Sequence, residues 1–211
     1  MAITPDDAQQ ILGLEVDGKA VTEGFNNKFS FNDIYALSQK LFGLNHIERE
    51  SVLEMKDGRL SKKFNLKKLR DTLWETKKRI RKECSGSLVE ASYLQLLDPL
   101  DKMREYSWGT AVVAFLKNEL TKCSRELTKQ VNENTCLFQV WIYLHFPSLF
   151  KGNSYVIVGE NIAINKPRAQ RYSFKGGQDK EMPQQLMKLR NAIDKLTADD
   201  VIFDPYRDDR R

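Results

Sequence analysis

Apolar residues recur every three or four positions along much of this 211-residue chain, which is the spacing of one face of an α-helix. The spacing predicts helices over residues 5–12, 31–42, 66–80, 88–97, 108–127, 135–146 and 183–196. In the last of these, the apolar stripe is Leu186, Leu189, Ile193 and Leu196. The pattern therefore indicates a mainly helical protein.

Residues with known preferences for helix ends mark several of these boundaries. Thr4-Pro5-Asp6-Asp7 supplies a capping hydroxyl, a proline at the first helical position and acids in the first turn. Gly13 and Gly43 are predicted to end the helices before them, and Pro147 to end the helix over 135–146.

The helix expected over 108–127 has the clearest division into an apolar and a polar side. Ser107 is its predicted cap. Its core-facing side is predicted to consist of Trp108, Val112, Phe115, Cys123 and Leu127. The helix over 135–146 is apolar on nearly all sides, which is typical of a helix at the centre of a core.

Short β elements are predicted where alternating apolar residues flank turn-forming ones. Residues 155–164 are expected to form a hairpin around Gly159-Glu160-Asn161, followed by a basic loop over 166–180. The predicted fold is thus a compact helical domain with small β-hairpin elements, and a chain of this length fits a single domain over residues 1–211.

Composition excludes some classes of protein. Apolar residues make up 41% of the chain, and no apolar run approaches the roughly 20 residues that cross a bilayer. The N-terminus lacks the features of a secretory signal, so an intracellular protein is expected. Cys84, Cys123 and Cys136 are odd in number and widely spaced, which favours reduced thiols over disulfides.

The positive charge is concentrated in residues 56–83, which carry 12 basic and 4 acidic groups. Such a segment can bind phosphate backbones or an acidic protein surface. A solvated helix face is the alternative interpretation. The candidate contact residues for nucleic acid or a partner are Lys62, Lys63, Lys67, Lys68, Arg70, Lys77, Lys78, Arg79, Arg81 and Lys82.

Catalytic motifs are weak in this sequence. Gly13 to Ala20 matches part of a phosphate-binding loop, but Ala20 lacks the hydroxyl that would hold magnesium. His145 lies in an apolar helix, where a core imidazole is the common outcome. Acidic residues near the C-terminus, including Asp199 and Asp200, suggest a magnesium site, but Asp200 can instead form a capping box with Thr197. We therefore predict no catalytic, metal or cofactor-binding residues.

Four stretches together resemble the plant mobile domain, a family found in plant transposable elements and in host proteins of the MAIN-LIKE group. They are residues 4–21, Tyr106 to Ala111, Leu137 to Trp141 with Phe146-Pro147, and Asp200 to Tyr206. The family-signature positions, expected to be structural, are Trp108, Gly109, Trp141, Pro147, Asp200, Pro205 and Tyr206. Trp108 and Trp141 are expected to be core anchors.

The resemblance implies a non-enzymatic, nuclear module for protein–protein interaction in chromatin complexes. Members of the family are implicated in transposon silencing, genome integrity and meristem maintenance. The implied partners are a phosphatase-seven-like protein or another plant mobile domain, and a homodimer fits as well. The family has also been described as aminotransferase-like, but no local motif for pyridoxal phosphate is present, so no cofactor is expected.

Direct binding of DNA or RNA by the basic segment remains an alternative, and a transposon-derived metal-dependent enzyme a third. The sequence also departs from the family in two ways. Family members usually have a further segment before the equivalent of Thr4, so an N-terminally truncated domain is expected. A family helix is expected to be missing near residues 75–86, where this chain is mostly charged.

Overall fold

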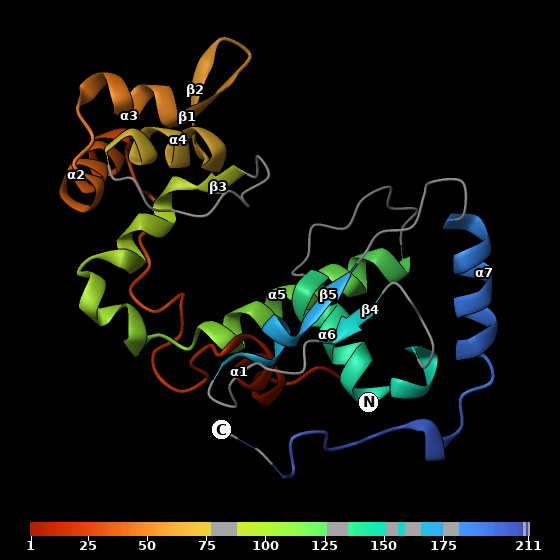
Figure 1. The fold of residues 1–211 in the computed structure, drawn as a ribbon. Helices are drawn as coiled ribbons and strands as arrows, with labels where there is room; N and C mark the ends of the chain where they lie inside the picture. Colours follow the sequence, from red (N-terminus) through yellow and green to blue (C-terminus); the bar gives the residue numbers. More distant parts are fainter. Residues whose placement is uncertain are drawn as a thin grey trace. The chain divides into compact units, whose positions relative to one another are not determined.

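The computed structural model describes residues 1–76, 88–125, 135–150, 156–158, 166–174, 182–208 and 210 (Figure 1). The chain forms two compact units: Met1–Gly18 with Tyr106–Arg211, and Lys19–Glu105. Helices predominate in both units and the strands are short, which confirms the prediction of a mainly helical protein with small β elements. A single domain over residues 1–211 stays a prediction.

In the first unit, helix α1 (Pro5–Leu12) packs against both α5 (Trp108–Arg125) and α6 (Thr135–His145). The other elements are η3 (Pro147–Phe150), β4 (Val156–Val158), η4 (Arg168–Arg171), β5 (Tyr172–Phe174), α7 (Met182–Ile193) and η6 (Ala198–Asp200). The core consists of Ile3, Ala8, Ile11, Val113, Leu116, Leu137, Val140 and Trp141. Three core residues come from α6, as predicted for a central helix.

The second unit combines helices with a small antiparallel sheet of strand order β1-β2-β3. Its elements are α2 (Phe31–Phe42), α3 (His46–Val52), β1 (Leu53–Lys56), β2 (Arg59–Asn65), α4 (Leu66–Thr76), β3 (Leu88–Glu90), η1 (Ala91–Leu97) and η2 (Leu100–Glu105). Its core consists of Phe29, Ile34, Leu44, Val52, Leu53, Phe64, Ala91 and Leu94.

Helix ends follow the predicted capping chemistry. Thr4 caps α1 in a capping box with Asp7, so that each side chain binds the backbone N–H of the other residue. Helix α1 ends at Gly13 and α2 at Gly43, both as predicted. Local hydrogen bonds thus mark the ends of these helices, as the sequence predicts.

The β1-β2 hairpin is not predicted from the sequence, because residues 56–65 are interpreted only as part of the basic segment. Asp57 and Gly58 form its two-residue turn with φ values of 50° and 73°, and Lys56 pairs with Arg59. A positive φ at both turn positions is the geometry that Asp-Gly favours. The Asp-Gly pair was therefore a usable signal for this hairpin.

The helix predicted over 88–97 is wrong. Leu88–Glu90 forms strand β3, and Phe64 pairs with Val89 across the β2-β3 ladder. Ala91–Leu97 then continues as a 3-10 helix, with Ala91 and Leu94 in the core. Pairing with a strand about 25 residues earlier overrides the local helical pattern in this segment.

The buried side of α5 differs from the predicted one. Gly109, Val113 and Leu116 are buried, whereas Phe115 is 51% exposed. The Gly109 amide donates to the Glu15 carbonyl oxygen over 2.7 Å. This close approach of the backbone turns Gly109 inward. A pattern that counts only apolar side chains cannot detect it, because glycine has none.

Two further segments differ from the sequence-based expectation. Strand β4 pairs antiparallel with β5, which lies in the stretch predicted to be a basic loop. Residues 155 and 159–164 of the predicted hairpin lie outside the described residues. The last helix, α7, includes the predicted start at Pro183, but Leu186, Leu189 and Ile193 of its stripe are exposed.

Replacing Gly109 by valine is expected to destabilise the first unit. A Cβ at this position would lie 2.7 Å from Val16 Cγ1 and 3.2 Å from the Glu15 carbonyl oxygen. Overpacking of this kind lowers the free energy of unfolding by about 1–3 kcal/mol, measurable by urea denaturation followed by circular dichroism. Ala114→Val, on the exposed side of α5, should cost less than about 1 kcal/mol. Equal losses in the two variants would contradict this account.

Candidate functional site

A buried polar cluster joins α1, the end of α6 and the closing turn of the chain. Its central group is the carboxylate of Asp7. The Tyr206 hydroxyl donates to Asp7 Oδ1 over 2.7 Å, and His145 Nε2 lies 3.2 Å from the same oxygen. The other carboxylate oxygen accepts from the amide and the hydroxyl of Thr4, both at 2.7 Å. Asp7, His145 and Tyr206 are all buried.

Each ring nitrogen of His145 lies within hydrogen-bond distance of an oxygen atom. Nδ1 lies 2.7 Å from the Ile202 carbonyl oxygen, which can only accept, so Nδ1 carries a proton. Nε2 faces the Asp7 carboxylate, which is also an acceptor when ionised. Both ring nitrogens of His145 therefore face oxygen acceptors.

Burial and hydrogen bonding act in opposite directions on Asp7. Burial by itself raises the pKa of this carboxyl, but hydrogen bonds from His145, Thr4 and Tyr206 outweigh it and hold the pKa below the ordinary value of 3.8. Burial, followed by the hydrogen bond to Asp7, raises the pKa of Tyr206. Asp7 is therefore ionised at neutral pH while the phenol keeps its proton and donates.

Aromatic contacts surround the cluster. The ring of Trp141 lies 4.9 Å from that of His145, and Tyr206 meets His145 edge to face at 6.1 Å. The guanidinium of Arg168 lies 4.9 Å from the Tyr206 ring. Arg168 is itself buried and donates to the Gln10 side chain over 2.6 Å. These contacts hold the rings in place from several elements of the first unit.

The hydrogen bonds of this cluster fit a structural role. A histidine that hydrogen-bonds a carboxylate is also found in catalytic triads, where the second ring nitrogen acts on a nucleophile. Here the second nitrogen binds the Ile202 carbonyl oxygen, so both nitrogens of His145 are already used. The cluster ties three segments of the chain together, and we call Asp7, His145 and Tyr206 the buried clasp.

Sequence reasoning found only part of the buried clasp. Tyr206 was a family-signature position, and His145 was interpreted as a core imidazole. Asp7 was considered only as an acid in the first turn of a helix. Its hydrogen-bond partners lie 138 and 199 residues away, beyond the reach of any local pattern. A usable hint was that Asp7 directly precedes Ala8 on the apolar side of α1.

The other family-signature positions lie in or near the first core. Trp141 is buried, and Trp108 is half-buried at the start of α5, with its ring 5.9 Å from that of Tyr106. The role of Trp108 as a core anchor stays a prediction. Pro147 begins η3, one residue beyond the end of α6 at His145. The Asp200 carboxylate accepts from the Thr197 amide and hydroxyl in the predicted capping box, and Pro205 precedes Tyr206 in the closing turn.

The structure describes five of the ten basic candidate residues. Lys62 donates to the Phe29 carbonyl oxygen over 2.5 Å, Lys63 pairs with Glu90 at 3.3 Å, and Arg70 pairs with Asp71 at 2.6 Å. Lys67 and Lys68 are exposed on the first turn of α4. Lys77, Lys78, Arg79, Arg81 and Lys82 lie outside the described residues, as do most of residues 75–86, where a family helix was expected to be missing.

Metal-ligating residues do not gather within the described ranges. Among those residues, no group of three His, Cys, Asp or Glu side chains is placed so as to hold a metal ion. Cys123 and Cys136 are free thiols, and Cys84 lies outside the described residues. In the part of the chain that the structure describes, no helix combines the length and the apolar character needed to span a membrane.

Comparison with known proteins identifies the family. A family model of the plant mobile domain matches residues 1–211, so this chain belongs to the plant mobile domain family. It is similar to Protein MAINTENANCE OF MERISTEMS of Arabidopsis thaliana, with 26% identity over 227 residues that cover 99% of this chain and 44% of the relative. It is also similar to Protein MAIN-LIKE 2 of the same plant, with 23% identity over 222 residues, covering 98% of this chain and 31% of the relative.

The chain therefore spans less than half the length of these curated relatives. No solved structure matches it.

The buried clasp predicts a pH-dependent effect of Asp7→Asn. At about pH 7 this variant should lose about 2–4 kcal/mol of unfolding free energy, because it removes the buried carboxylate that accepts hydrogen bonds from Thr4 and Tyr206 and lies beside His145 Nε2. The pKa of Asp7 is lower in the folded state than its ordinary value of 3.8. The ionised carboxylate therefore stabilises the fold fully above pH 3.8, and this stabilisation is lost as the pH falls through the folded-state pKa. The deficit should therefore shrink below pH 3.8 in urea titrations.

Asp17→Asn is the matched control, because it removes the same charge from an exposed residue. It should change the unfolding free energy by less than about 0.5 kcal/mol at every pH. A deficit for Asp7→Asn that does not depend on pH would contradict the assignment of an ionised, bonded carboxylate.

Proposed function

We propose that this plant mobile domain is a protein–protein interaction module of nuclear assemblies that act on chromatin, without catalytic activity of its own. The observation that carries the proposal is the use of polar groups in the buried clasp. Asp7, His145 and Tyr206 bind one another and the backbone, and none of these bonds leaves a reactive group at the surface. Because these buried polar groups are used to hold the fold together, we assign the function of the domain to contacts made by its surface.

The relatives of this chain support the same proposed function. The chain is similar to a protein named for the maintenance of meristems. Roles in transposon silencing, genome integrity and meristem maintenance are the roles that the family resemblance implies, and we extend them to this chain as part of the proposal. Nuclear localisation belongs to it as well, because assemblies on chromatin are found there.

A phosphatase-seven-like protein is the partner proposed for this module. The purified chain should form a complex with such a protein, with a dissociation constant of about 10 μM or tighter in isothermal titration calorimetry. Asp17→Asn, which changes an exposed residue, serves as a folded control, and bovine serum albumin as a control for non-specific binding. A folded chain that does not bind the phosphatase-seven-like protein at about 100 μM would contradict the choice of partner.

Nucleic-acid binding is a second candidate function, favoured by the exposed Lys67 and Lys68 at the start of α4. Lysines of this kind bind phosphates and release counterions, so the affinity for DNA should fall steeply with added salt. If the basic segment binds DNA, the slope of log K against log salt should become less steep by about one for each phosphate contact removed.

The test compares two variants with the same change in charge. The first replaces Lys62, Lys63, Lys67 and Lys68 by glutamate. The second replaces Lys117, Lys122, Lys188 and Lys195, which lie on α5, on α7 and just beyond α7. Only the first should lose affinity in fluorescence anisotropy with a labelled duplex. Equal losses would indicate a non-specific charge effect, and no binding at low salt would exclude this function.

A further inference from the structure

The turn of the β1-β2 hairpin projects from the second unit. The residues around this turn are exposed, and they are Met55, Lys56, Asp57, Gly58 and Arg59. Figure 1 shows the turn extending beyond helices α3 and α4. A projecting element of this kind can reach into the surface of a partner while the rest of its unit stays outside.

The base of the hairpin is held by the core. Leu53 pairs with Phe64, and both side chains are buried in the second core. The Ser61 hydroxyl donates to Glu54 Oε2 over 2.9 Å between the same two strands. The turn is therefore an exposed tip on a fixed base, and a partner that binds it has little backbone to order.

Two cations face each other at this tip. Lys56 lies directly opposite Arg59 across the hairpin, and side chains in such a pair lie on the same face of the strands. Phe64 is in the core, so alternation along β2 turns Arg59 to the other face. Like charges directly opposite each other destabilise a hairpin. An anion bound between these two side chains would offset their repulsion.

Other parts of the protein do not neutralise the two cations. Among the residues that the structure describes, neither Lys56 nor Arg59 takes part in an ion pair. Lys63, on the same strand, differs because it pairs with Glu90 at 3.3 Å. Asp57 lies in the turn between the cations and lowers the local charge, which leaves one net positive charge at the tip.

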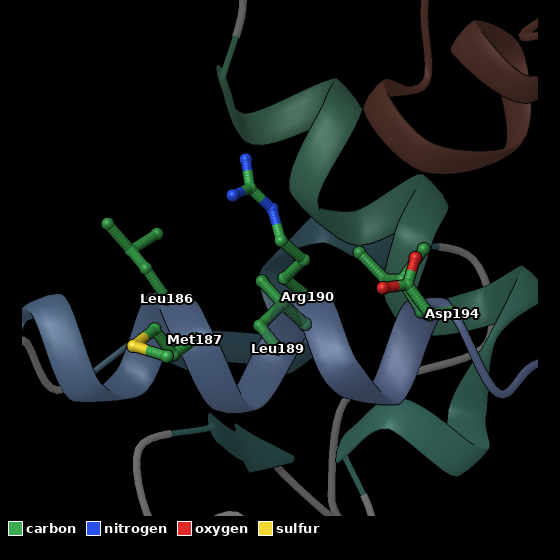
Figure 2. Close-up of a pocket in the computed structure, with 6 residues that line it drawn as sticks. Leu186, Met187, Leu189, Arg190 and Asp194 are labelled. Carbon is green, nitrogen blue, oxygen red and sulfur yellow. The ribbon is translucent and has the colours of Figure 1, made fainter.

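The charge of the tip also distinguishes its hollow from the hollow along α7. Two cations and one anion line the hollow at the tip, together with Leu60 and Ser61. The hollow along α7 contains one cation and one anion, Arg190 and Asp194, among apolar side chains (Figure 2). Of these two hollows, the one at the tip carries the charge that attracts an anion.

The net charge of the chain lies in the second unit. Residues 19–105 carry 18 basic and 13 acidic groups, whereas the first unit carries 16 of each. DNA carries about one negative charge for every 1.7 Å of its axis. A duplex can therefore contact the tip and further basic residues of this unit at the same time, which a small anion does not do.

We propose that the tip of the β1-β2 hairpin binds the phosphate backbone of duplex DNA through Lys56 and Arg59. The major groove, about 12 Å wide, admits a two-stranded β-ribbon between its rows of phosphates. The Arg59 guanidinium can donate two parallel hydrogen bonds to one phosphate, and the Lys56 ammonium supplies a point charge. This inference rests on the nucleic-acid binding proposed above as a second function, and adds two contact residues to the ten basic candidates.

The first test removes both cations from the 211-residue chain, as Lys56→Gln with Arg59→Gln. Affinity for a labelled DNA duplex, measured by fluorescence anisotropy at about 0.1 M salt, should fall about tenfold. The slope of log K against log salt should become less steep by about two, because two phosphate contacts are lost. Lys117→Gln with Lys188→Gln removes the same charge from exposed positions of the first unit. This control should leave the affinity within about twofold and the slope unchanged.

The second test changes the affinity in the opposite direction. Asp57→Asn removes the negative charge between the cations, and Asn-Gly favours the same turn as Asp-Gly. Affinity for the duplex should therefore rise about threefold. Circular dichroism and the urea midpoint should match those of the unchanged chain. A gain of affinity has the further advantage that damage to the fold does not produce it.

The outcomes separate this inference from the function on which it rests. A chain that does not bind the duplex at low salt excludes both. If Lys67→Gln with Lys68→Gln lowers the affinity while the hairpin variant does not, nucleic-acid binding stands and the role of the hairpin is overturned. An affinity that Asp57→Asn leaves unchanged contradicts a phosphate between the cations. If the hairpin variant loses labelled polyglutamate as strongly as the duplex, the tip recognises acidic chains in general, and the assignment to DNA fails.

Discussion

The Asp7 carboxylate connects three parts of the chain that are far apart in the sequence. It caps the first turn of α1 through Thr4, accepts the hydroxyl of Tyr206 and lies beside His145 at the end of α6. A buried carboxylate is costly unless donors surround it, so each partner supports the presence of the others. The start of α1, the end of α6 and the closing turn are therefore coupled through one group.

This coupling gives a physical meaning to several family-signature positions. Trp141 packs against His145, and Tyr206 donates to Asp7. Gly109 lets α5 approach residues 15 and 16 beside α1. These residues hold the first unit together, so the family resemblance identifies an architecture more directly than it identifies a reaction.

Two exposed surfaces of this chain differ in the forces that they exert. Lys67 and Lys68 in the second unit present charge, which acts over a distance and is weakened by salt. The row on α7 in the first unit presents apolar area, which acts only on contact. Each surface can therefore be altered without the other.

The sequence by itself determined the boundaries of α1 and α2 and the position of α6, because caps at Thr4, Gly13 and Gly43 act within three or four residues. It also indicated the apolar row of α7. Only the tertiary structure decided the rotation of α5 about Gly109, the strand at Leu88–Glu90 and the pairing of Asp7 with His145. Those features depend on partners distant in the chain, whereas periodicity and capping record only what neighbouring residues do.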